Sequence, residues 1–319
     1  MRPSRSVPRS ALVATPPTCW SVPAEATIRR TLARLDPEAL AAAIGAWLTD
    51  RSPRPNRRRG AVAVDGKTLR GARRDGRQVH LLAAMDHATR AVVAQRQVDG
   101  APGEVPGFQP LLADLDLADT LVTADALQTH RDAAEFLVVA KRAHYLLALK
   151  ANQHTLRKRC AELAWHRVPV LDRTRDQAHG RVEIRTLKAV TVHHFGFPHA
   201  AQVLQVTRKR RALHTRRWRT VKAYAITSLT FAQASPARLA DLLWAHWAIE
   251  HGLHWIRDVT FAEDGSQVRT GTASQVMACL RNLVIGALSR AGPVNLAVAR
   301  PHHSRDPPRP LATLGISLR

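Results

Sequence analysis

The spacing of hydrophobic residues changes along the chain, and each spacing predicts a different kind of element. Between residues 24 and 50, apolar positions recur every three or four residues on both sides of Asp36 and Pro37, which predicts a small module of two helices. The segment 51–60 is rich in proline and arginine, a composition typical of a linker. The main domain is therefore expected to begin after this linker.

Three strand-like runs follow the linker. The first, at 61–71, reaches Asp65 and Gly66 after alternating alanines and valines, which predicts a strand that ends in a turn at these two residues. Two further apolar runs, at 79–86 and 91–98, flank a short polar turn. Together the three runs predict an antiparallel meander.

A fourth apolar run, at 119–126, places Asp125 at its end, and a predicted helix and a fifth strand at 144–150 come next. Three antiparallel strands followed by strand, helix and strand form the ribonuclease-H-like order, in which a right-handed crossover puts the fourth strand beside the first. We therefore expect an α/β fold built on a ribonuclease-H-like mixed five-stranded sheet with flanking helices. In that fold Asp65 and Asp125 face each other.

Alternation with period two returns between about residues 178 and 232 and predicts a β-rich insertion that interrupts this core. Its most basic part lies between Arg208 and Lys222 and combines a cluster of cations with an indole, which suits phosphate binding and base stacking. A solvated hairpin is an equally good interpretation. The residues of this part that we single out as DNA ligands are Arg210, Arg211, Arg216, Arg217 and Trp218.

Helical spacing then resumes. A helix is expected to begin at Ser235 and Pro236 and to carry Glu250 on or beside its packed face, and an amphipathic helix at 274–291 should complete the core. The main domain thus spans residues 60–290. The segment 291–319 is expected to form a loose C-terminal tail.

The net charge narrows the set of partners. The 319 residues include 48 Lys and Arg against 25 Asp and Glu, so the net charge is +23 and the chain should attract a polyanion. Nucleic acid is favoured over an anionic membrane, because no apolar run approaches the roughly 20 residues that a membrane-spanning helix needs. The Arg-, Ser- and Pro-rich residues 1–23 are expected to be a disordered leader.

The three cysteines limit the redox chemistry and the compartment. Cys19, Cys160 and Cys279 include no CxxC pair, which argues against a disulfide framework and against a zinc ribbon. A reducing cytoplasm fits this usage.

Three carboxylates stand out as candidates for chemistry. Asp65 and Asp125 end two apolar strands, and Glu250 lies in an aromatic-rich helix, where burying an unpaired charge is unfavourable. Divalent metal ions would remove that cost, and two such ions can activate a water or a 3′-hydroxyl for in-line displacement at phosphorus. These acids therefore predict metal-dependent phosphodiester chemistry.

A zinc site is the competing interpretation of the same helix. His246, Glu250 and His254 are spaced i, i+4 and i+8 on one helical stripe, as in a zinc hydrolase. The histidines are flanked by Trp247 and Trp255, so amphipathic packing or DNA contact explains them without a zinc ion, and the zinc site is the minor alternative.

Five short blocks also occur in a fixed order along the chain: VDGKTLRG at Asp65, VTADALQTH at Asp125, YLLALKANQHTL around Lys150, HGRVEIR from His179, and HWAIEHGLHWIRDVTFAED around Glu250. Together they resemble the ISAs-type insertion-sequence transposases, the H-repeat-associated group of DDE enzymes. The resemblance covers nearly the whole chain.

This resemblance implies a DNA transposase with a ribonuclease-H-like core. It implies magnesium dependence (Mg²⁺ or Mn²⁺, two ions), with Asp65, Asp125 and Glu250 as the acidic triad. In our hypothesis Asp65 bridges the two ions, and Asp125 and Glu250 each complete one coordination sphere. The residues expected to hold the DNA strand are Lys67, Lys150, Asn152 and Gln153, with His179, Arg181 and Arg185 as further candidates.

The expected partners are the terminal inverted repeats of an insertion sequence and target DNA, with self-association on DNA in a bacterial, nucleoid-associated setting. The resemblance also implies that residues 24–50 are the remnant of a longer helical N-terminal region, so this copy is expected to be truncated. Two positions depart from the family pattern: Trp244 stands where an arginine is usual, and His251 where an asparagine is usual. An inactive DNA-binding relic and a nuclease that cuts without joining are the alternative functions.

Overall fold

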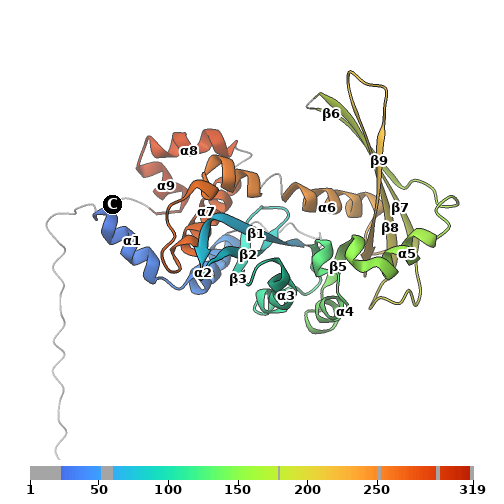
Figure 1. Ribbon diagram of the computed structural model, residues 1–319, viewed down its shortest axis with the longest axis horizontal. Helices are drawn as coiled ribbons and strands as arrows, with labels where there is room; N and C mark the ends of the chain where they lie inside the picture. The colour runs from blue at the N-terminus through green and yellow to red at the C-terminus, as the bar shows by residue number, and fades with distance from the viewer. Residues whose placement is uncertain (1–22, 52–59, 179, 250–252, 292–294, 317–319) are drawn as a thin grey trace, which may run out of the picture.

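A mixed β-sheet with helices on both faces forms the centre of the molecule (Figure 1). The computed structural model describes residues 23–51, 60–178, 180–249, 253–291 and 295–316. In this part of the chain the sheet has nine strands in the order β3-β2-β1-β4-β5-β9-β8-β7-β6. The mixed α/β class predicted from the sequence is confirmed, whereas the predicted leader and all but the ends of the linker lie outside the described residues.

The first five strands form one half of the sheet. β1 (Ala61–Arg74), β2 (Arg77–Asp86) and β3 (Val92–Val98) are an antiparallel meander. β4 (Leu121–Ala124) pairs parallel to β1, and β5 (His144–Leu149) pairs parallel to β4. The fourth strand therefore lies beside the first.

The turn predicted at Asp65 and Gly66 is wrong. β1 continues through both residues, and Asp65 is paired with Ala83 of β2. The hairpin turn lies ten residues further on, at a second Asp-Gly pair, where Asp75 and Gly76 both have positive φ (50° and 78°). Such left-handed conformations at both central residues are typical of the tight turns whose twist matches that of a hairpin.

The predicted insertion continues the main sheet. β9 (Arg219–Thr227) pairs antiparallel with β5, and β8 (Gln202–Ala212) and β7 (Arg181–Thr191) follow outward. β6 (Asp172–Ala178) begins the insertion earlier than predicted, because its residues are polar and mostly exposed and so show no alternation. The sheet is thus larger than the predicted five strands, and its outer strands project from the body as an arm, defined as β6–β9 (Figure 1).

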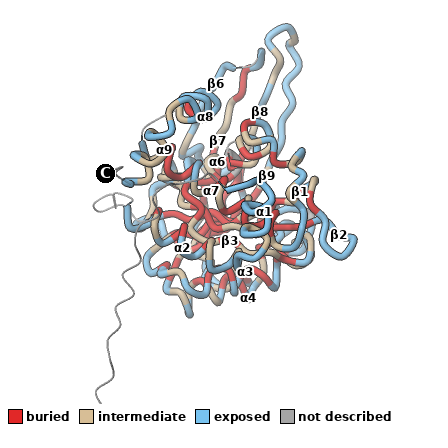
Figure 2. Tube along the Cα trace, turned by 90° about the vertical axis from the view of Figure 1, so that its left-hand side faces the viewer, coloured by how far each residue is buried: buried red, intermediate tan, exposed pale blue. Residues whose placement is uncertain are grey.

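Helices cover the two faces of the sheet. α3 (Glu104–Leu112), α4 (Arg131–Glu135) and α5 (His154–Glu162) contribute to the core on one face, and α6 (Pro236–Ile249) and α7 (Ala273–Arg290) cover the other. Figure 2 shows that burial is concentrated at the centre of the sheet and that the outer end of the arm is exposed. The side chains that fill the first face include Leu82, Phe108, Val122, Leu137 and Leu147.

The N-terminal module has the predicted two helices, α1 (Glu25–Arg34) and α2 (Pro37–Asp50). The Asp36 carboxylate accepts hydrogen bonds from the first backbone amides of α2, which makes it the N-cap of that helix. α2 packs against β3 and α7 and buries Leu48 completely.

The C-terminal segment differs from the loose tail that was predicted. It forms α8 (Leu296–Ser304) and α9 (Pro308–Thr313). The guanidinium of Arg300 donates to the carbonyl oxygen of Thr260 at 2.9 Å, which ties α8 to the segment that follows α6. Within the residues described, no helix is long and apolar enough to cross a membrane.

Gly45 tests how closely α2 packs on the sheet. A Cβ at this position would overlap the backbone carbonyl of Val93 in β3. We expect Gly45→Ala to lower the free energy of unfolding by about 1–3 kcal/mol through overpacking, although alanine is the better helix former. Urea denaturation measures the change, with Ala42→Gly on the exposed face of the same helix as control. A stabilised Gly45→Ala variant would contradict this packing.

Candidate active site

The parallel pairing of β1 and β4 brings Asp65 and Asp125 together. The paired positions run from Ala61 with Leu121 to Val64 with Ala124, so the two aspartates are the next residues in register, directly after the parallel ladder. Asp125 follows the last residue of β4, whereas Asp65 lies within the longer β1. Neighbouring strands lie about 4.8 Å apart, and side chains alternate between the faces of a sheet. Both aspartates therefore project from the face that α6 covers.

Residues 250–252, which include Glu250, lie outside the described residues, but His246 and His254 on either side of them contact this face. Four positions before it, the His246 Nδ1 is 3.0 Å from the hydroxyl of Thr123 in β4. Four positions after it, the His254 Nε2 is 3.8 Å from the Asp65 Oδ2. The chain on either side of Glu250 is thus held at the strand ends that carry the two aspartates.

Two lysines lie beside the aspartates. The ammonium of Lys150, which is largely exposed, donates to the Asp125 Oδ2 at 2.8 Å. Lys67 is buried, and its ammonium donates to both carboxylate oxygens of Asp258 at 2.7 Å. Lys67 is therefore bound to the segment after Glu250, and its contact with DNA stays a prediction.

Asn152 and Gln153 lie in the short helical turn that follows Lys150. The amide of Asn152 donates to the carbonyl oxygen of Ala126 at 2.9 Å. Asn152 thus holds the backbone directly after Asp125. Contact of either side chain with DNA stays a prediction.

Three histidines lie near the two aspartates: His246 is buried, and His87 and His254 are half-buried. The Thr123 hydroxyl lies 2.8 Å from the His87 Nε2 in addition to its contact with His246. Burial, together with the charges of His246 and Arg238, lowers the pKa of His87 to about 4. Burial also lowers the pKa of His246 to about 4, against the opposing effect of Asp125. Both imidazoles are therefore neutral at pH 7.

The pKa of His254 is also lowered, again mainly by burial. Burial, and after it the positive charges of Arg257 and Lys67, lower this pKa to about 3. The imidazole next to Asp65 is thus a neutral group at pH 7.

The donor set at the strand ends suits a hard divalent cation. The carboxylates of Asp65 and Asp125 are partly exposed, with side-chain exposures of 19% and 27%. Oxygen ligands of this kind are those that Mg²⁺ and Mn²⁺ prefer. Within the ranges that the structure describes, no three His, Cys, Asp or Glu residues are grouped to hold a metal ion, so a full ligand set needs a further residue.

One buried carboxylate of β7, Glu183, organises several arginines of the arm. Arg185 and Arg208 donate to it at 2.6 and 2.7 Å, and Arg181 lies 3.9 Å away. Burial alone would raise the pKa of Glu183, but these hydrogen bonds and charges outweigh it and lower the pKa. The guanidinium of Arg185 lies 5.1 Å from the ring centre of Trp244 in α6. The tryptophan that stands where the family usually has an arginine therefore makes a cation–π contact with the arm.

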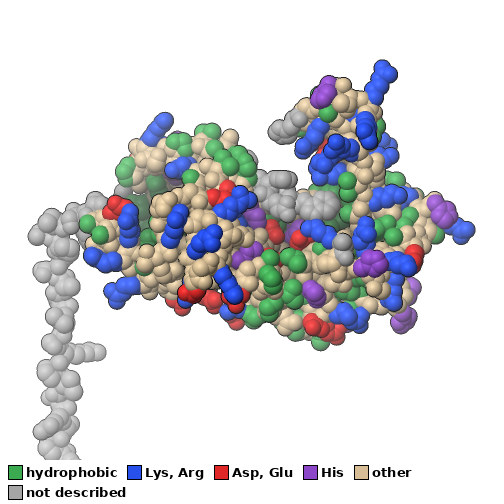
Figure 3. Space-filling view, in the orientation of Figure 1, with side chains coloured by type: hydrophobic (Ala, Val, Ile, Leu, Met, Phe, Trp, Pro, Cys, Tyr) green, Lys and Arg blue, Asp and Glu red, His purple; other side chains and the backbone are tan. Residues whose placement is uncertain are grey.

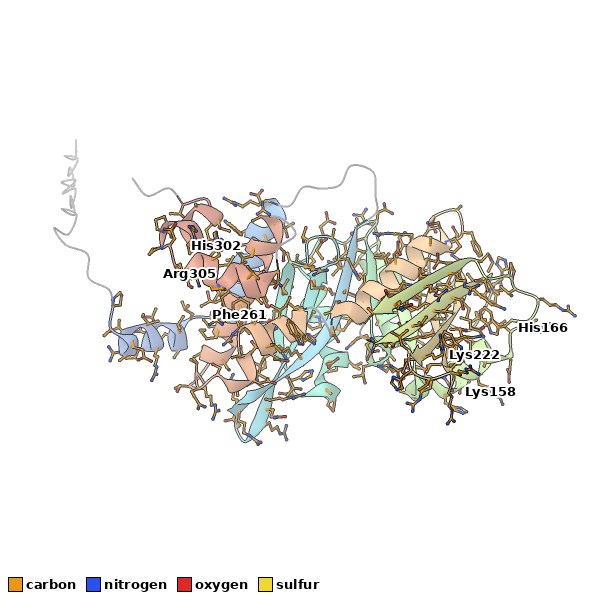
Figure 4. The ribbon with its side chains drawn as sticks, turned by 90° about the horizontal axis from the view of Figure 1, so that it is seen from above. Lys158, His166, Lys222, Phe261, His302 and Arg305 are labelled. Atoms are coloured by element: carbon orange, nitrogen blue, oxygen red, sulfur yellow. The ribbon has the colours of Figure 1, made fainter. Side chains whose placement is uncertain are left out.

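The outer part of the arm carries exposed cations. Arg210 is exposed at the end of β8, and Arg216 and Arg217 are exposed in the loop before β9. The guanidinium of Arg211 lies 5.3 Å from the ring of Trp218, which is 40% exposed. Figure 3 shows Lys and Arg side chains gathered on this projecting part, and Figure 4 shows Lys222 at the same end of the molecule. His179 lies outside the described residues.

Several residues at the site escaped the sequence analysis. Asp258, His87 and Thr123 come from three distant segments, and their sequence positions show no common spacing. Only the packing of α6 and its continuation against β1 and β4 brings them to the aspartates.

Comparison with known proteins places this site in a family. The family model described as the transposase DDE domain matches residues 56–286, which is most of the chain. The chain therefore belongs to the DDE transposases, and the resemblance to the H-repeat-associated group is confirmed.

Two relatives illustrate this membership. YncI of Escherichia coli O157:H7, a candidate transposase, is 28% identical over 285 residues, which cover 84% of this chain and 71% of YncI. YhhI of Escherichia coli K12, named as an H repeat-associated candidate transposase, is 25% identical over the same length, 84% of this chain and 74% of its own.

A solved structure of the piggyBac transposase synaptic complex with hairpin DNA is more distant. It has a TM-score of 0.39 and 10% identity, and the match covers 74% of this chain and 49% of that one. This likeness is too slight to add to the argument.

The histidines near the two aspartates predict how stability depends on pH. The pKa of His87 is 6.5 in the unfolded chain and about 4 in the folded protein, so the unfolded state binds more protons between these values. The free energy of unfolding should therefore fall as the pH drops below about 6.5, by on the order of 1–3 kcal/mol for this group. His87→Gln, which keeps a hydrogen-bonding group beside Thr123, should make the loss between pH 7 and pH 5 smaller.

Urea denaturation at the two pH values provides the measurement. His302→Gln, on the exposed surface of α8 (Figure 4), controls for loss of a histidine as such. A His87→Gln variant that loses as much stability as the unmodified protein would refute the assignment.

Proposed function

We propose that this DDE transposase cleaves DNA at the ends of an insertion sequence and joins the freed 3′ ends to target DNA, with Asp65, Asp125 and Glu250 as its metal-binding carboxylates. The observation that carries the proposal is the register of β1 and β4, which puts Asp65 and Asp125 side by side on the face that α6 covers. The contacts of His246 and His254, on both flanks of Glu250, support the third position.

The sheet order supports a ribonuclease-H-like core. An antiparallel meander is followed by two strands parallel to its first member, and the two aspartates directly follow the parallel ladder of β1 and β4. Mg²⁺ or Mn²⁺ held by the three carboxylates would supply an activated water or 3′-hydroxyl and a stabilised leaving oxygen. The protein's own contribution is to hold these oxygens on one face and to orient the DNA phosphate.

Lys150 is the DNA ligand that the geometry favours most. Its exposed ammonium is 2.8 Å from Asp125, so a phosphate bound by Lys150 lies next to the carboxylates. Asn152 keeps the turn after Asp125 in place through its bond to Ala126. Lys67, paired with Asp258, joins β1 to the segment after Glu250 and acts by positioning.

The arm is proposed as the main DNA-binding surface. Its exposed cations at Arg210, Arg216 and Arg217, with Trp218, suit a phosphate backbone and an adjacent base. Arg185 contacts Trp244 of α6 and lies closer to the body of the sheet than Arg210 does. Arg181 begins β7 opposite Ala212, at the outer end of the arm, and adds to these cations. Terminal repeats, target DNA and a second copy of the chain on DNA are the partners that this function requires.

The acidic residues should separate cleavage from binding. Asp65→Asn, Asp125→Asn and Glu250→Gln should each reduce Mg²⁺-dependent cleavage by roughly 10²-fold or more, because each removes a metal ligand. Affinity for duplex DNA should change little or should rise, because a negative charge beside the phosphates is lost. Nicking and strand transfer on labelled ends of the element, together with a binding titration in Ca²⁺, measure both properties.

Asp114→Asn, an exposed carboxylate after α3, is the matched control and should cut normally. Cleavage that survives Asp65→Asn would defeat the triad. Cleavage without a joined product would favour the nuclease, and binding without any cleavage by the unmodified protein would favour the relic.

The arm should determine the salt dependence of binding. Replacing Arg216 and Arg217 by glutamine should weaken binding to duplexes of any sequence and lower the slope of log K against log salt by up to about 2, since each phosphate contact contributes about 0.9. Fluorescence anisotropy at several salt concentrations measures the slope.

Arg30→Gln with Arg34→Gln is the charge-matched control. Both residues are exposed on α1, at the opposite end of the molecule from the arm (Figure 1). Equal effects of the two double variants would show that net charge, and not the arm, governs binding.

A further inference from the structure

A series of hydrogen-bonded polar side chains lies beneath the proposed site, on the opposite face of the sheet. The Glu104 Oε1 is 2.7 Å from the His80 Nε2, and the His80 Nδ1 is 2.8 Å from the hydroxyl of Thr68. The other carboxylate oxygen of Glu104 accepts a hydrogen bond from the amide of Gln128 at 3.2 Å. His80, Glu104 and Gln128 are buried, with exposures of 6%, 6% and 2%.

These side chains contact the backbone beside each of the two aspartates. At one end, a Cβ on Gly66 would overlap both the Glu104 carboxylate and the His80 imidazole, so these groups touch the backbone directly after Asp65. At the other end, the backbone amide of Gln128 donates to the carbonyl oxygen of Asp125 at 3.0 Å. One carboxylate therefore links the backbone after Asp65 to the turn after Asp125.

Stability alone does not account for this arrangement. A buried carboxylate loses its hydration, and well-packed apolar side chains of similar volume often serve a core as well or better. The Gln128 Oε1 is also buried and has no hydrogen-bond partner among the described residues, so the amide of Gln128 is ordered mainly by its donation to Glu104. The Glu104 carboxylate is thus costly to bury, and its contacts with His80 and Gln128 are specific.

We infer that Glu104 is a positioning residue that sets the separation of the Asp65 and Asp125 carboxylates from the far face of the sheet, with His80 and Gln128 as its two contacts. The inference rests on the proposed function, because it assigns those carboxylates to metal binding. Its consequence is that changes at Glu104, which lies beneath the sheet, should alter metal affinity. Partners that orient metal ligands typically change that affinity by 10- to 100-fold when removed.

The test measures Mn²⁺ binding to the whole protein without DNA, by the loss of the free Mn²⁺ paramagnetic resonance signal. Glu104→Ala should raise the Mn²⁺ Kd by about 10-fold or more, and Glu104→Gln, which keeps the size and one acceptor, should raise it less. Leu112→Ala is the matched control: it lies on the same helix and is fully buried, so it should lower stability without changing the Kd. Thermal unfolding followed by circular dichroism compares the stabilities of the variants.

Gln128→Leu provides a second variant that leaves the contact between His80 and Glu104 in place, and it should raise the Kd several-fold even if Glu104→Ala does not fold. An unchanged Kd in a folded Glu104→Ala protein, or in Gln128→Leu if Glu104→Ala does not fold, would overturn the inference. An equal rise of the Mn²⁺ Kd in Leu112→Ala would also overturn the inference, because general destabilisation would then explain the change in Kd. If Asp65→Asn binds Mn²⁺ as well as the unmodified protein does, the proposed metal site itself fails, which is a separate result.

Discussion

The parallel pairing of β1 with β4 is the constraint on which the rest of the site depends. Four consecutive residue pairs hold the two strands in register, and both strands then end their parallel ladder at an aspartate. Because side chains alternate along a strand, a shift of one residue in either strand would send one carboxylate to the opposite face. The contacts from α6, from Lys150 and from Glu104 are arranged around this register.

Acidic groups in this strongly basic protein are mostly engaged in specific contacts. Glu183 anchors arginines of the arm, and Glu263 is buried between Arg257 and Arg281. Asp258 holds Lys67. Carboxylates used in this way neutralise internal cations and leave the exposed surface positive, which is the charge distribution that a DNA-binding protein needs.

The arm and the carboxylates share one sheet. Because β9 hydrogen-bonds to β5, the strands that carry the exposed arginines belong to the same sheet as the strands that carry the aspartates. α6 runs between them, with Trp244 against Arg185 of the arm and His246 against Thr123 of the centre. DNA bound along the arm would therefore be held in a defined relation to the site, since a hydrogen-bonded ladder joins the two parts.

The sequence alone determined most of the element types and the strand order of the first half, and it singled out three acids as candidates, because alternation, helical spacing and family motifs are local properties that a chain displays without its fold. The sequence could not show whether Asp65-Gly66 or Asp75-Gly76 forms the hairpin turn, because the position of the turn depends on how far β1 and β2 pair with each other. The polar strand β6 and the ion pair of Lys67 with Asp258 were hidden for a related reason. Pairing partners and burial are decided by segments distant along the chain, and only the tertiary structure brings those segments together.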